Sequence, residues 1–402
     1  MSISTLYLCY FGLREPLVQT QVLPYLREIA KGGVTVTLLT FEPDLRKRWS
    51  EIEITETKKA LTNENINWNC LPYHKRPTLP ATLFDILNGA HYAWKLVRRE
   101  KIAVLHARTH VPLIMALIVK ALTNCRVIFD IRGLVADEYV DAGVWRKGSF
   151  PFHLVKKVER LGLKRAEQIV VLTEKMKNHL VANKLKAAEN IEVVPCCVDF
   201  SRIRQSIYDN ERKAVRFELI YAGSVTGLYL LEEMGHFFLE LKKRIPKAFF
   251  RVLTTSPPAT VLATFDKLGI AQDDFEIQAV SPTEVPAFIG RARLAISFRK
   301  PTFSQIAASP TKIPEYLSVG VPVVANAGIG DMDALLENTN VGVVLQNFEP
   351  LSLLNAVDSA LRLFEDENLA NRCIETALTN FDLTTVGGKG YLNVYERIAK
   401  NL

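Results

Sequence analysis

Residues 309–326 read "SPTKIPEYLSVGVPVVAN", and this stretch decides the fold because it joins a short helix to a buried strand. Thr311 suits the N-cap, because Pro314 then falls in the first turn, where a proline removes no internal hydrogen bond. Gly320 ends the helix after roughly two turns. The apolar run after Pro322 predicts a strand. A helix followed directly by a buried strand is typical of an α/β sheet.

The same alternation of strands and helices runs through the whole chain. In the first half, apolar runs such as "STLYLCYF", "VTVTLLTF" and "CRVIFDIRG" alternate with helical patterns, for example "PLVQTQVLPYLREIAKGG". The second half starts the pattern again with "VRFELIYAGSV", "AFFRVLTT" and "RLAISF". Strands that alternate with helices predict parallel pairing. We therefore predict an α/β protein with two Rossmann-like domains whose parallel sheets face each other across a cleft.

The domain organisation follows from where this pattern stops and starts again. The segment around residues 201–215 is polar and lacks a strand signal, which is typical of a linker. We predict an N-terminal domain at 1–200, the linker at 201–215, a C-terminal domain at 216–380, and at 381–402 a C-terminal helix. This helix follows a glycine-rich break, and we expect it to pack back on the first domain.

The charge of the chain is concentrated in its first half. Residues 1–200 hold 29 Lys and Arg against 20 Asp and Glu, or +9, and the remainder holds 21 against 23, or −2, which together give the net +7. A basic half indicates an anionic partner, which would be nucleic acid, a phosphate-bearing substrate or a membrane surface. The alternative is a solvated surface that happens to be basic.

Cysteines and apolar runs predict a reduced cytoplasmic protein. None of the six cysteines forms a C-x-x-C pair, so we expect no structural zinc. The longest apolar stretch, residues 111–122, is interrupted by Lys120 and predicts a buried helix instead of a membrane span. The N-terminus lacks the basic start of a signal peptide. The loops "YFGLREP" and "YAGSVTGLY" lack the G-x-G-x-x-G spacing, which argues against NAD.

The helix that starts after Thr311 has the features of a nucleotide site. Its free N–H groups and Lys312 at the first position would attract an anion. Glu315, one turn later on a similar side, would accept hydrogen bonds from vicinal hydroxyls such as those of a ribose. Phosphate and ribose together indicate a nucleotide. The alternative is an ordinary helix with a lysine and a glutamate on its surface.

At this point the sequence resembles a known family. "SPTKIPEYLSVGVPVVAN" is similar to the carboxyl-domain signature of retaining glycosyltransferases of family 4, which have the GT-B fold. The segments "FDIRGLVADEYVDAG", "AEQIVVLTEKMKNHL", "IEVVPCCVDFSRI" and "LIYAGSV" also resemble this family, in the same order. The resemblance implies transfer of a sugar from a nucleotide-sugar to a glycan or lipid-linked acceptor, with retention, in cell-surface polysaccharide biosynthesis.

The resemblance also implies roles for residues of the second domain. Glu315 would bind the ribose, and the helix start at Thr311 and Lys312 would meet the diphosphate. The usual basic pair of the family is missing, so the phosphate charge must be met elsewhere, and Arg299 and Lys300 at the end of "LAISF" are candidates alongside Lys312. Lys312 and Arg299 would stabilise the leaving phosphate without a metal or cofactor, so they are the candidate catalytic residues. The other candidates on the donor side are Ser309, Gly223, Ser224, Val280, Ser281 and Gly328.

Two departures from the family pattern affect the donor side. The family commonly has a glutamate eight positions before Glu315, where this chain has Ala307. The usual Arg/Lys pair after the first strand of the second domain is absent from "GSVTGLYLLEEM". These departures fit either an active subgroup or a non-catalytic paralogue that binds a nucleotide or a partner. A nucleotide-sugar epimerase is a further alternative.

On the acceptor side, the candidates are Gly12, Arg14, His110 and Arg132. His110 would face the cleft or serve as a structural histidine. Arg132 would pair with a substrate phosphate, or with Asp137 or Glu138. The segment "HARTH" lacks the glutamate of a zinc helix, and "DMD" at 331–333 reads as acids at a helix start, so we expect no metal. Nucleic acid is not an expected partner, whereas an anionic inner membrane face is.

Overall fold

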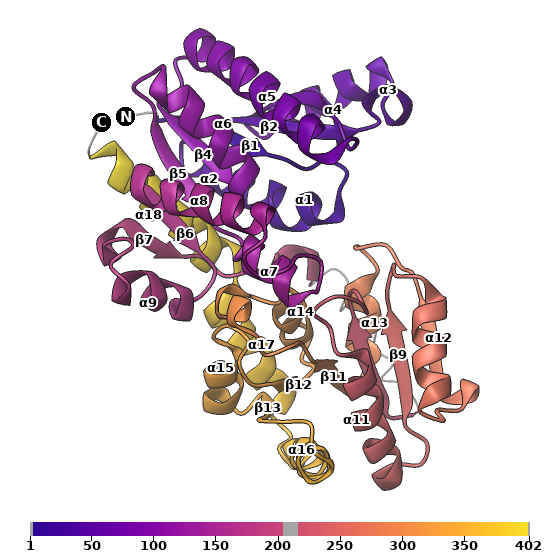
Figure 1. Ribbon diagram of the computed structural model, residues 1–402. Helices are drawn as coiled ribbons and strands as arrows, with labels where there is room; N and C mark the ends of the chain where they lie inside the picture. Colours follow the sequence, from indigo (N-terminus) through magenta and orange to yellow (C-terminus); the bar gives the residue numbers. More distant parts are fainter. Residues whose placement is uncertain (1–2, 204–215, 401–402) are drawn as a thin grey trace. The chain divides into compact units, whose positions relative to one another are not determined.

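The structure is a computed structural model that describes residues 3–203 and 216–400. It divides into two compact units (Figure 1). Unit 1 comprises Met1–Ala136, Arg146–Pro195 and Leu383–Leu402, and unit 2 comprises Asp137–Trp145 and Cys196–Asp382. Most of the linker expected at 201–215 lies outside the described residues. A short segment from the first half of the sequence therefore groups with unit 2, and the end of the chain groups with unit 1.

Unit 1 is built on a seven-stranded parallel sheet in the order β3-β2-β1-β4-β5-β6-β7. Its strands are β1 (Ser4–Cys9), β2 (Thr35–Pro43), β3 (Ile66–Tyr73), β4 (Val104–Arg108), β5 (Arg126–Asp130), β6 (Gln168–Val171) and β7 (Ile191–Val193). Its helices are α1 (Pro16–Gln21), α2 (Leu23–Lys31), α3 (Leu45–Arg48), α4 (Glu51–Asn63), α5 (Thr78–Glu100), α6 (His110–Ala121), α8 (Phe150–Arg165), α9 (Glu174–Ala182) and α18 (Lys389–Ala399), with the short turns η1 (Ala188–Asn190) and η5 (Leu383–Gly388). Helix α7 (Val135–Asp141) runs from unit 1 into unit 2.

Unit 2 has a six-stranded parallel sheet in the order β10-β9-β8-β11-β12-β13. Its strands are β8 (Glu218–Ala222), β9 (Phe249–Leu253), β10 (Phe275–Gln278), β11 (Leu294–Ser297), β12 (Val323–Asn326) and β13 (Gly342–Leu345). Its helices are α11 (Leu231–Arg244), α12 (Pro258–Lys267), α13 (Val285–Arg291), α14 (Lys312–Ser318), α15 (Met332–Thr339), α16 (Pro350–Arg362) and α17 (Leu369–Phe381), with η2 (Gln272–Asp274), η3 (Phe303–Ala307) and η4 (Leu363–Glu365). The two parallel α/β sheets predicted from the sequence are confirmed.

The predicted elements form for local reasons that the structure makes visible. Ser50 and Glu53 form a reciprocal capping box at the start of α4, and the side chain of Thr173 caps α9. The helix predicted over "PLVQTQVLPYLREIAKGG" is divided into α1 and α2 at Val22, whose backbone is not helical. The division fits Pro24, because a proline has no amide hydrogen to bond the carbonyl four residues earlier and its ring clashes with that carbonyl, so one helix cannot continue through it.

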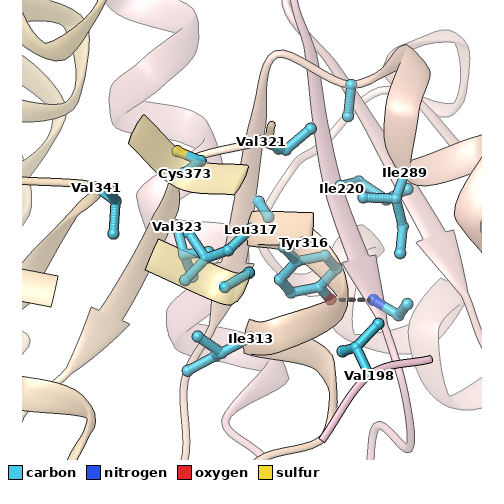
Figure 2. Close-up of a cluster of buried hydrophobic side chains, with 14 of the residues drawn as sticks. Val198, Ile220, Ile289, Ile313, Tyr316, Leu317, Val321, Val323, Val341 and Cys373 are labelled. Atoms are coloured by element: carbon cyan, nitrogen blue, oxygen red, sulfur yellow. Dashed lines mark hydrogen bonds between the residues drawn. The ribbon is translucent and has the colours of Figure 1, made fainter. Parts of the chain in front are cut away.

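Each face of the second sheet is covered by its own buried cluster. One cluster packs α13, α14 and α17 against the sheet and includes Tyr316, Leu317 and Cys373 (Figure 2). The other packs α11, α12 and α16 and includes Phe237, Phe250 and Phe265. Burial on both faces explains why these strands read as continuous apolar runs in the sequence. The same packing fixes the ends of the strands, and the candidate site is built from these ends.

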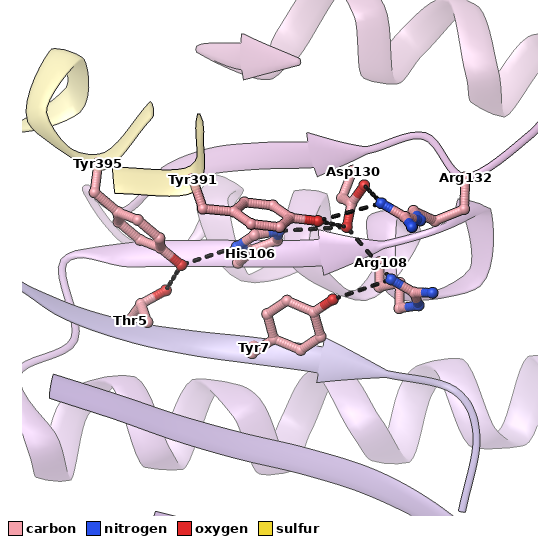
Figure 3. A network of polar contacts seen from close by, with 8 residues as sticks. All are labelled: Thr5, Tyr7, His106, Arg108, Asp130, Arg132, Tyr391 and Tyr395. Carbon is pink, nitrogen blue, oxygen red and sulfur yellow. Dashed lines mark hydrogen bonds and ion pairs between the residues drawn. The ribbon is translucent and has the colours of Figure 1, made fainter. Parts of the chain in front are cut away.

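The C-terminal helix α18 is anchored in unit 1 by a buried polar network (Figure 3). The hydroxyl of Tyr391 donates to Asp130 Oδ2 at 2.8 Å, and the hydroxyl of Tyr395 lies 2.8 Å from His106 Nδ1 and 3.2 Å from Thr5 Oγ1. Burial would raise the pKa of Asp130, but the charge of Arg132, the hydrogen bond with His106 and the charge of Arg108 outweigh it, so the pKa is lowered. The glycine-rich break expected before this helix is instead the π-helical turn η5, which leads directly into α18.

Candidate functional site

The candidate donor residues lie at one edge of the second sheet. All strands of this sheet are parallel, so the loops that follow them emerge at the same carboxyl edge. Open α/β sheets bind their ligands at this edge. The candidates and the strands they follow are Gly223 and Ser224 after β8, Val280 and Ser281 after β10, Arg299 after β11, and Gly328 after β12.

Helix α14 carries the pair that led to the nucleotide interpretation. It spans Lys312–Ser318 with Thr311 at the N-cap position, as predicted. Lys312 Nζ lies 2.8 Å from Glu315 Oε2, so the two side chains share one side of the helix. The side chain of Glu315 is 9% exposed and that of Lys312 is 31% exposed. The carboxylate is thus held at a fixed place by a cation that a ligand can still reach.

The capping hydroxyl predicted for Thr311 is wrong. Its side chain makes no capping hydrogen bond, and its backbone is already helical (φ −58°, ψ −25°). The first turn starts one residue earlier, with the amide of Ile313 donating to the carbonyl of Pro310 at 3.3 Å. Ser309 Oγ accepts a hydrogen bond from the amide of Cys196 at 3.1 Å. Ser309 therefore has a structural partner within unit 2.

Arg299 is held in place by three side chains that the sequence analysis did not single out. Its Nε donates to Gln305 Oε1 at 2.8 Å, and one terminal nitrogen donates to the hydroxyl of Tyr229 at 3.2 Å. Asn326 accepts from the backbone amide of Arg299 at 2.8 Å and donates to its carbonyl at 2.9 Å. A guanidinium has five N–H donors, and these contacts use two of them. Donors are left to meet an anion.

These positioning residues carried only a weak sequence signal. Asn326 is the one polar residue that closes the apolar run "VPVVA", and it is 2% exposed. Gln305 is fully buried in η3, the same short turn that contains Ala307. Ala307 is itself 2% exposed, so the position where the family commonly has a glutamate holds a buried methyl group here.

The loop after β8 is shaped by two tyrosines. The amide of Ala222 donates to the hydroxyl of Tyr316 at 2.8 Å, and the hydroxyl of Tyr221 donates to the carbonyl of Ser224. Gly223 has φ +155°, and a side-chain carbon there would lie 2.9 Å from the Tyr221 hydroxyl oxygen. This close approach explains why glycine occupies the turn.

The loop after β12 is held by hydrogen bonds to α15 and to η3. The amide of Gly328, at φ +85°, donates to Asp333 Oδ2 at 3.0 Å, and the amide of Gly330 donates to the carbonyl of Gln305 at 2.8 Å. Asp331 is the N-cap residue of α15 and Asp333 lies in its first turn, so their predicted place at a helix start is confirmed. After β10, the amide and hydroxyl of Ser281 donate to Glu284, which fixes the turn that Val280 enters.

In unit 1, Gly12 and Arg14 line a cavity of about 170 Å³ at the carboxyl edge of the first sheet. The guanidinium of Arg14 stacks 3.7 Å from the ring centre of Trp49 and pairs with Glu53 at 2.6 Å. Glu42 closes the floor, where Oε1 accepts from the amide of Leu13 at 2.8 Å. Burial raises the pKa of Glu42. The cavity thus combines cations, an aromatic ring and carboxyl groups.

The other two acceptor-side candidates are buried among structural partners. His110 Nε2 lies 3.5 Å from Glu159 Oε2, and both side chains are 7% exposed. Burial would raise the pKa of Glu159, but His110 and Lys156 outweigh it and hold the pKa below its usual value. Arg132 lies 3.6 Å from Asp130 Oδ1 and contacts the network that anchors α18. The structure therefore brings Arg132 together with Asp130, and His110 with Glu159.

Across residues 3–203 and 216–400, no three His, Cys, Asp or Glu side chains are grouped so that they could hold a metal ion. In the same residues, no helix combines the length and the apolar character needed to cross a bilayer. His106 and His110 have the partners described above.

Comparisons with known proteins agree with this architecture. Residues 18–202 match the family model described as Glycosyltransferase Family 4. No curated protein sequence matches the chain. Among solved structures, sucrose-phosphate synthase from Thermosynechococcus elongatus is similar with a TM-score of 0.73 and 12% identity, over 99% of this chain and 100% of that chain.

Two further structures are similar over nearly the whole chain. Anabaena HepE in complex with UDP has a TM-score of 0.67 and 14% identity, over 99% of this chain and 100% of that chain, and HepE is also known in complex with UDP-glucose. A structure titled as a UDP-N-acetylglucosamine 2-epimerase, from Listeria monocytogenes, has a TM-score of 0.64 and 13% identity, over 100% and 98%. The chain therefore has the GT-B fold predicted from the sequence, and its residues 18–202 match the model of Glycosyltransferase Family 4.

Proposed function

We propose that the protein is a retaining glycosyltransferase that moves a sugar from a nucleotide-sugar donor to a glycan or lipid-linked acceptor. The observation that carries this proposal is the pairing of Lys312 with Glu315 at the start of α14, in a GT-B chain whose first half matches family 4. A fixed carboxylate suits two neighbouring ribose hydroxyls, and the cation beside it suits a diphosphate. The structures of HepE with UDP and UDP-glucose support a nucleotide-sugar as the donor.

The chemistry asked of the protein is mainly electrostatic. The bond between the anomeric carbon and the diphosphate breaks, and negative charge grows on the leaving phosphate. Donors fixed in advance at that oxygen lower the barrier because they need no reorganisation during the reaction. Arg299 is restrained by Gln305 and Tyr229 and has N–H groups to spare, so it suits this role together with Lys312. In this proposal neither a metal nor a cofactor takes part.

Retention would follow if the acceptor hydroxyl attacks from the face that the phosphate leaves. The oxygen–carbon bond to the acceptor forms, the carbon–oxygen bond to the phosphate breaks, and the phosphate takes the hydroxyl proton. The atoms balance without a separate catalytic base. Gly12, Arg14, His110 and Arg132 remain the candidates for the acceptor, and the cavity beside Arg14 supports the first two.

The proposal also names a pathway and a location for the enzyme. We expect an acceptor of cell-surface polysaccharide biosynthesis and an enzyme at the cytoplasmic face of the membrane. The support is the excess of basic residues in positions 1–200, which suits phosphate-bearing or membrane-associated acceptors.

Thermal unfolding with UDP, GDP or ADP tests the donor site first. A ligand at a hundred times its Kd stabilises the folded state by about 2.7 kcal/mol, so the matching nucleotide will raise the Tm. Glu315→Gln should remove most of this shift, whereas Glu337→Gln, at an exposed position of α15, should leave it unchanged. If none of the three nucleotides changes the Tm of the wild type, the donor assignment is wrong.

Activity assays then separate the alternatives. Release of UDP from UDP-glucose that depends on an added glycan acceptor supports the transferase. Conversion of UDP-N-acetylglucosamine without any acceptor would support an epimerase, which the similarity to the Listeria structure makes the second candidate. Nucleotide binding without turnover would support a non-catalytic paralogue, consistent with the buried alanine at position 307.

A further inference from the structure

Four large apolar side chains of α5 are exposed to solvent. Leu79 is 61% exposed, Leu83 57%, and Phe84 and Leu87 are each 56% exposed. They stand at positions i, i+4, i+5 and i+8, which fall on one face of the helix. The opposite face is buried, and a side-chain carbon at Gly89 would lie 2.8 Å from Met115 Sδ of α6. The apolar stripe is therefore an outer surface and belongs to no core within unit 1.

Helix α8 repeats this arrangement on the other side of α6. Phe150 is 72% exposed, Leu154 43% and Leu161 44%. Its buried face meets α6 closely, since a side-chain carbon at Gly162 would lie 2.3 Å from Leu113 Cδ2. Helices α5, α6 and α8 connect strands that succeed one another in the same direction along the sheet, so right-handed crossovers place all three on one face (Figure 1).

The exposed charges on these helices have one sign. The exposed cations are Lys95, Arg98 and Arg99 of α5, and Lys157, Arg160, Lys164 and Arg165 of α8. The acidic side chains of the same helices are not exposed: Asp85 is fully buried and Glu159 is 5% exposed. Glu100 is partly buried and bonds to Thr37 and Arg99. Lys75 and Arg76, just before α5, add two more exposed cations.

A mixture of apolar and basic side chains without exposed acids is the complement of an anionic bilayer. Leucine and phenylalanine side chains enter the boundary between headgroups and acyl chains, while lysine and arginine meet the lipid phosphates. A second copy of the chain fits poorly, because the same face would oppose seven cations with seven cations. We propose that the outer face of α5 and α8, here called the docking face, binds an anionic lipid bilayer.

This inference deepens the proposed function but can be tested without it. Sedimentation of the full chain with vesicles needs no nucleotide and no acceptor. We expect the protein to sediment with vesicles that contain phosphatidylglycerol and to stay in solution with vesicles of phosphatidylcholine alone. Raising the salt from 0.1 M to 1 M shortens the Debye length from about 10 Å to about 3 Å, so it should weaken sedimentation strongly.

Variants then assign the binding to the docking face. Leu83→Ser with Phe84→Ser should weaken binding to anionic vesicles about tenfold or more, because two apolar side chains lose their insertion. Lys157→Gln, Arg160→Gln and Lys164→Gln together should weaken it about a hundredfold, since each cation at the surface contributes about fivefold. All five residues are exposed, so folding should be preserved, which circular dichroism checks.

Matched controls come from unit 2. Leu262→Ser with Leu351→Ser replaces two apolar side chains that are 42% and 67% exposed, and Lys243→Gln, Lys267→Gln and Arg362→Gln removes three exposed cations. Both controls should sediment like the wild type. The proposal is overturned if the wild type binds neutral and anionic vesicles equally or not at all, or if the controls lose as much binding as the docking-face variants.

One further outcome would point to a protein partner. If analytical ultracentrifugation shows a dimer that Leu83→Ser with Phe84→Ser converts to a monomer, the face binds a second copy and not lipid. A shift of Tm by UDP in that variant equal to the shift in the wild type would keep the donor site intact, so failure of the docking proposal would not be confused with failure of the proposed function.

Discussion

Replacing Tyr316 by phenylalanine tests how α14 is attached to the strand that leads into the donor loop. Tyr316 is fully buried, and its hydroxyl oxygen accepts the amide proton of Ala222, the last residue of β8, at 2.8 Å (Figure 2). The same helix carries Lys312 and Glu315. A change of one oxygen atom therefore affects both the stability of unit 2 and the geometry of the candidate site.

The expected magnitude follows from what the substitution leaves behind. Phenylalanine fills nearly the same volume, so the main loss is the acceptor of a buried N–H group. A buried donor without a partner costs about 1–3 kcal/mol. For a unit of about 150–250 residues, each kcal/mol lowers the Tm by about 2–4 °C, so we expect a fall of about 2–12 °C.

The assay is differential scanning calorimetry of the wild type, Tyr316→Phe and a control, Tyr92→Phe. The hydroxyl of Tyr92 donates to Asn69 at 3.1 Å, but the side chain is partly exposed, so water can replace the lost partner. The control should change the Tm by less than about 2 °C. A Tyr316→Phe protein as stable as the control would refute the reasoning, because it would mean that the Ala222 amide does not depend on this hydroxyl.

Three further predictions concern the site and the network of unit 1. Glu315→Gln should weaken UDP binding about 10- to 100-fold in calorimetric titration, because hydrogen bonds to a charged group are worth about 1.5–3 kcal/mol; unchanged affinity would contradict the ribose assignment. Arg299→Ala should lower kcat about 10²- to 10³-fold with little change in KM, as expected for a donor that acts on the leaving phosphate; a rise in KM alone would place Arg299 in ground-state binding. Burial lowers the pKa of His106 below its ordinary 6.5, so the unfolded chain takes up more protons below that pH. Stability should therefore fall as the pH drops below about 6.5, and His106→Asn should reduce this slope in urea titrations at pH 5 and pH 8.

The elements of the fold could be predicted because their signals are local. Thr311, Pro314 and Gly320 lie within ten positions of one another, and together they place α14 correctly. Apolar runs likewise mark the buried strands, since both faces of each sheet are covered. The capping hydroxyl was wrong for a related reason: whether Thr311 is extended or already helical depends on the turn before it, and the residue pattern does not encode that angle.

The contacts that shape the sites could not be predicted because they join distant positions. His106 and Tyr395 are 289 positions apart, and Asn326 is 27 positions from Arg299. The grouping of Asp137–Trp145 with unit 2 is of the same kind. From one sequence alone, a tyrosine inside an apolar helix, such as Tyr316, is interpreted as an ordinary core residue. The pattern does not indicate whether its hydroxyl also bonds to the end of a strand.

The departures from the family pattern can be understood by following the charge on the donor side. Two charged features that the family commonly has on the donor side are absent. They are the Arg/Lys pair after β8 and the glutamate at position 307, where the chain has a buried alanine. Of the two remaining candidate cations, Lys312 is largely neutralised by Glu315 at 2.8 Å. The side chain of Arg299 is hydrogen-bonded to an amide and a hydroxyl, which carry no charge. Its charge also acts on the buried carboxyl of Glu138, but burial outweighs this attraction and raises the pKa of Glu138, which disfavours the charged carboxylate. If the leaving phosphate is stabilised in unit 2, Arg299 should therefore contribute more than Lys312, and the buried Gln305 orients it through the hydrogen bond from Nε.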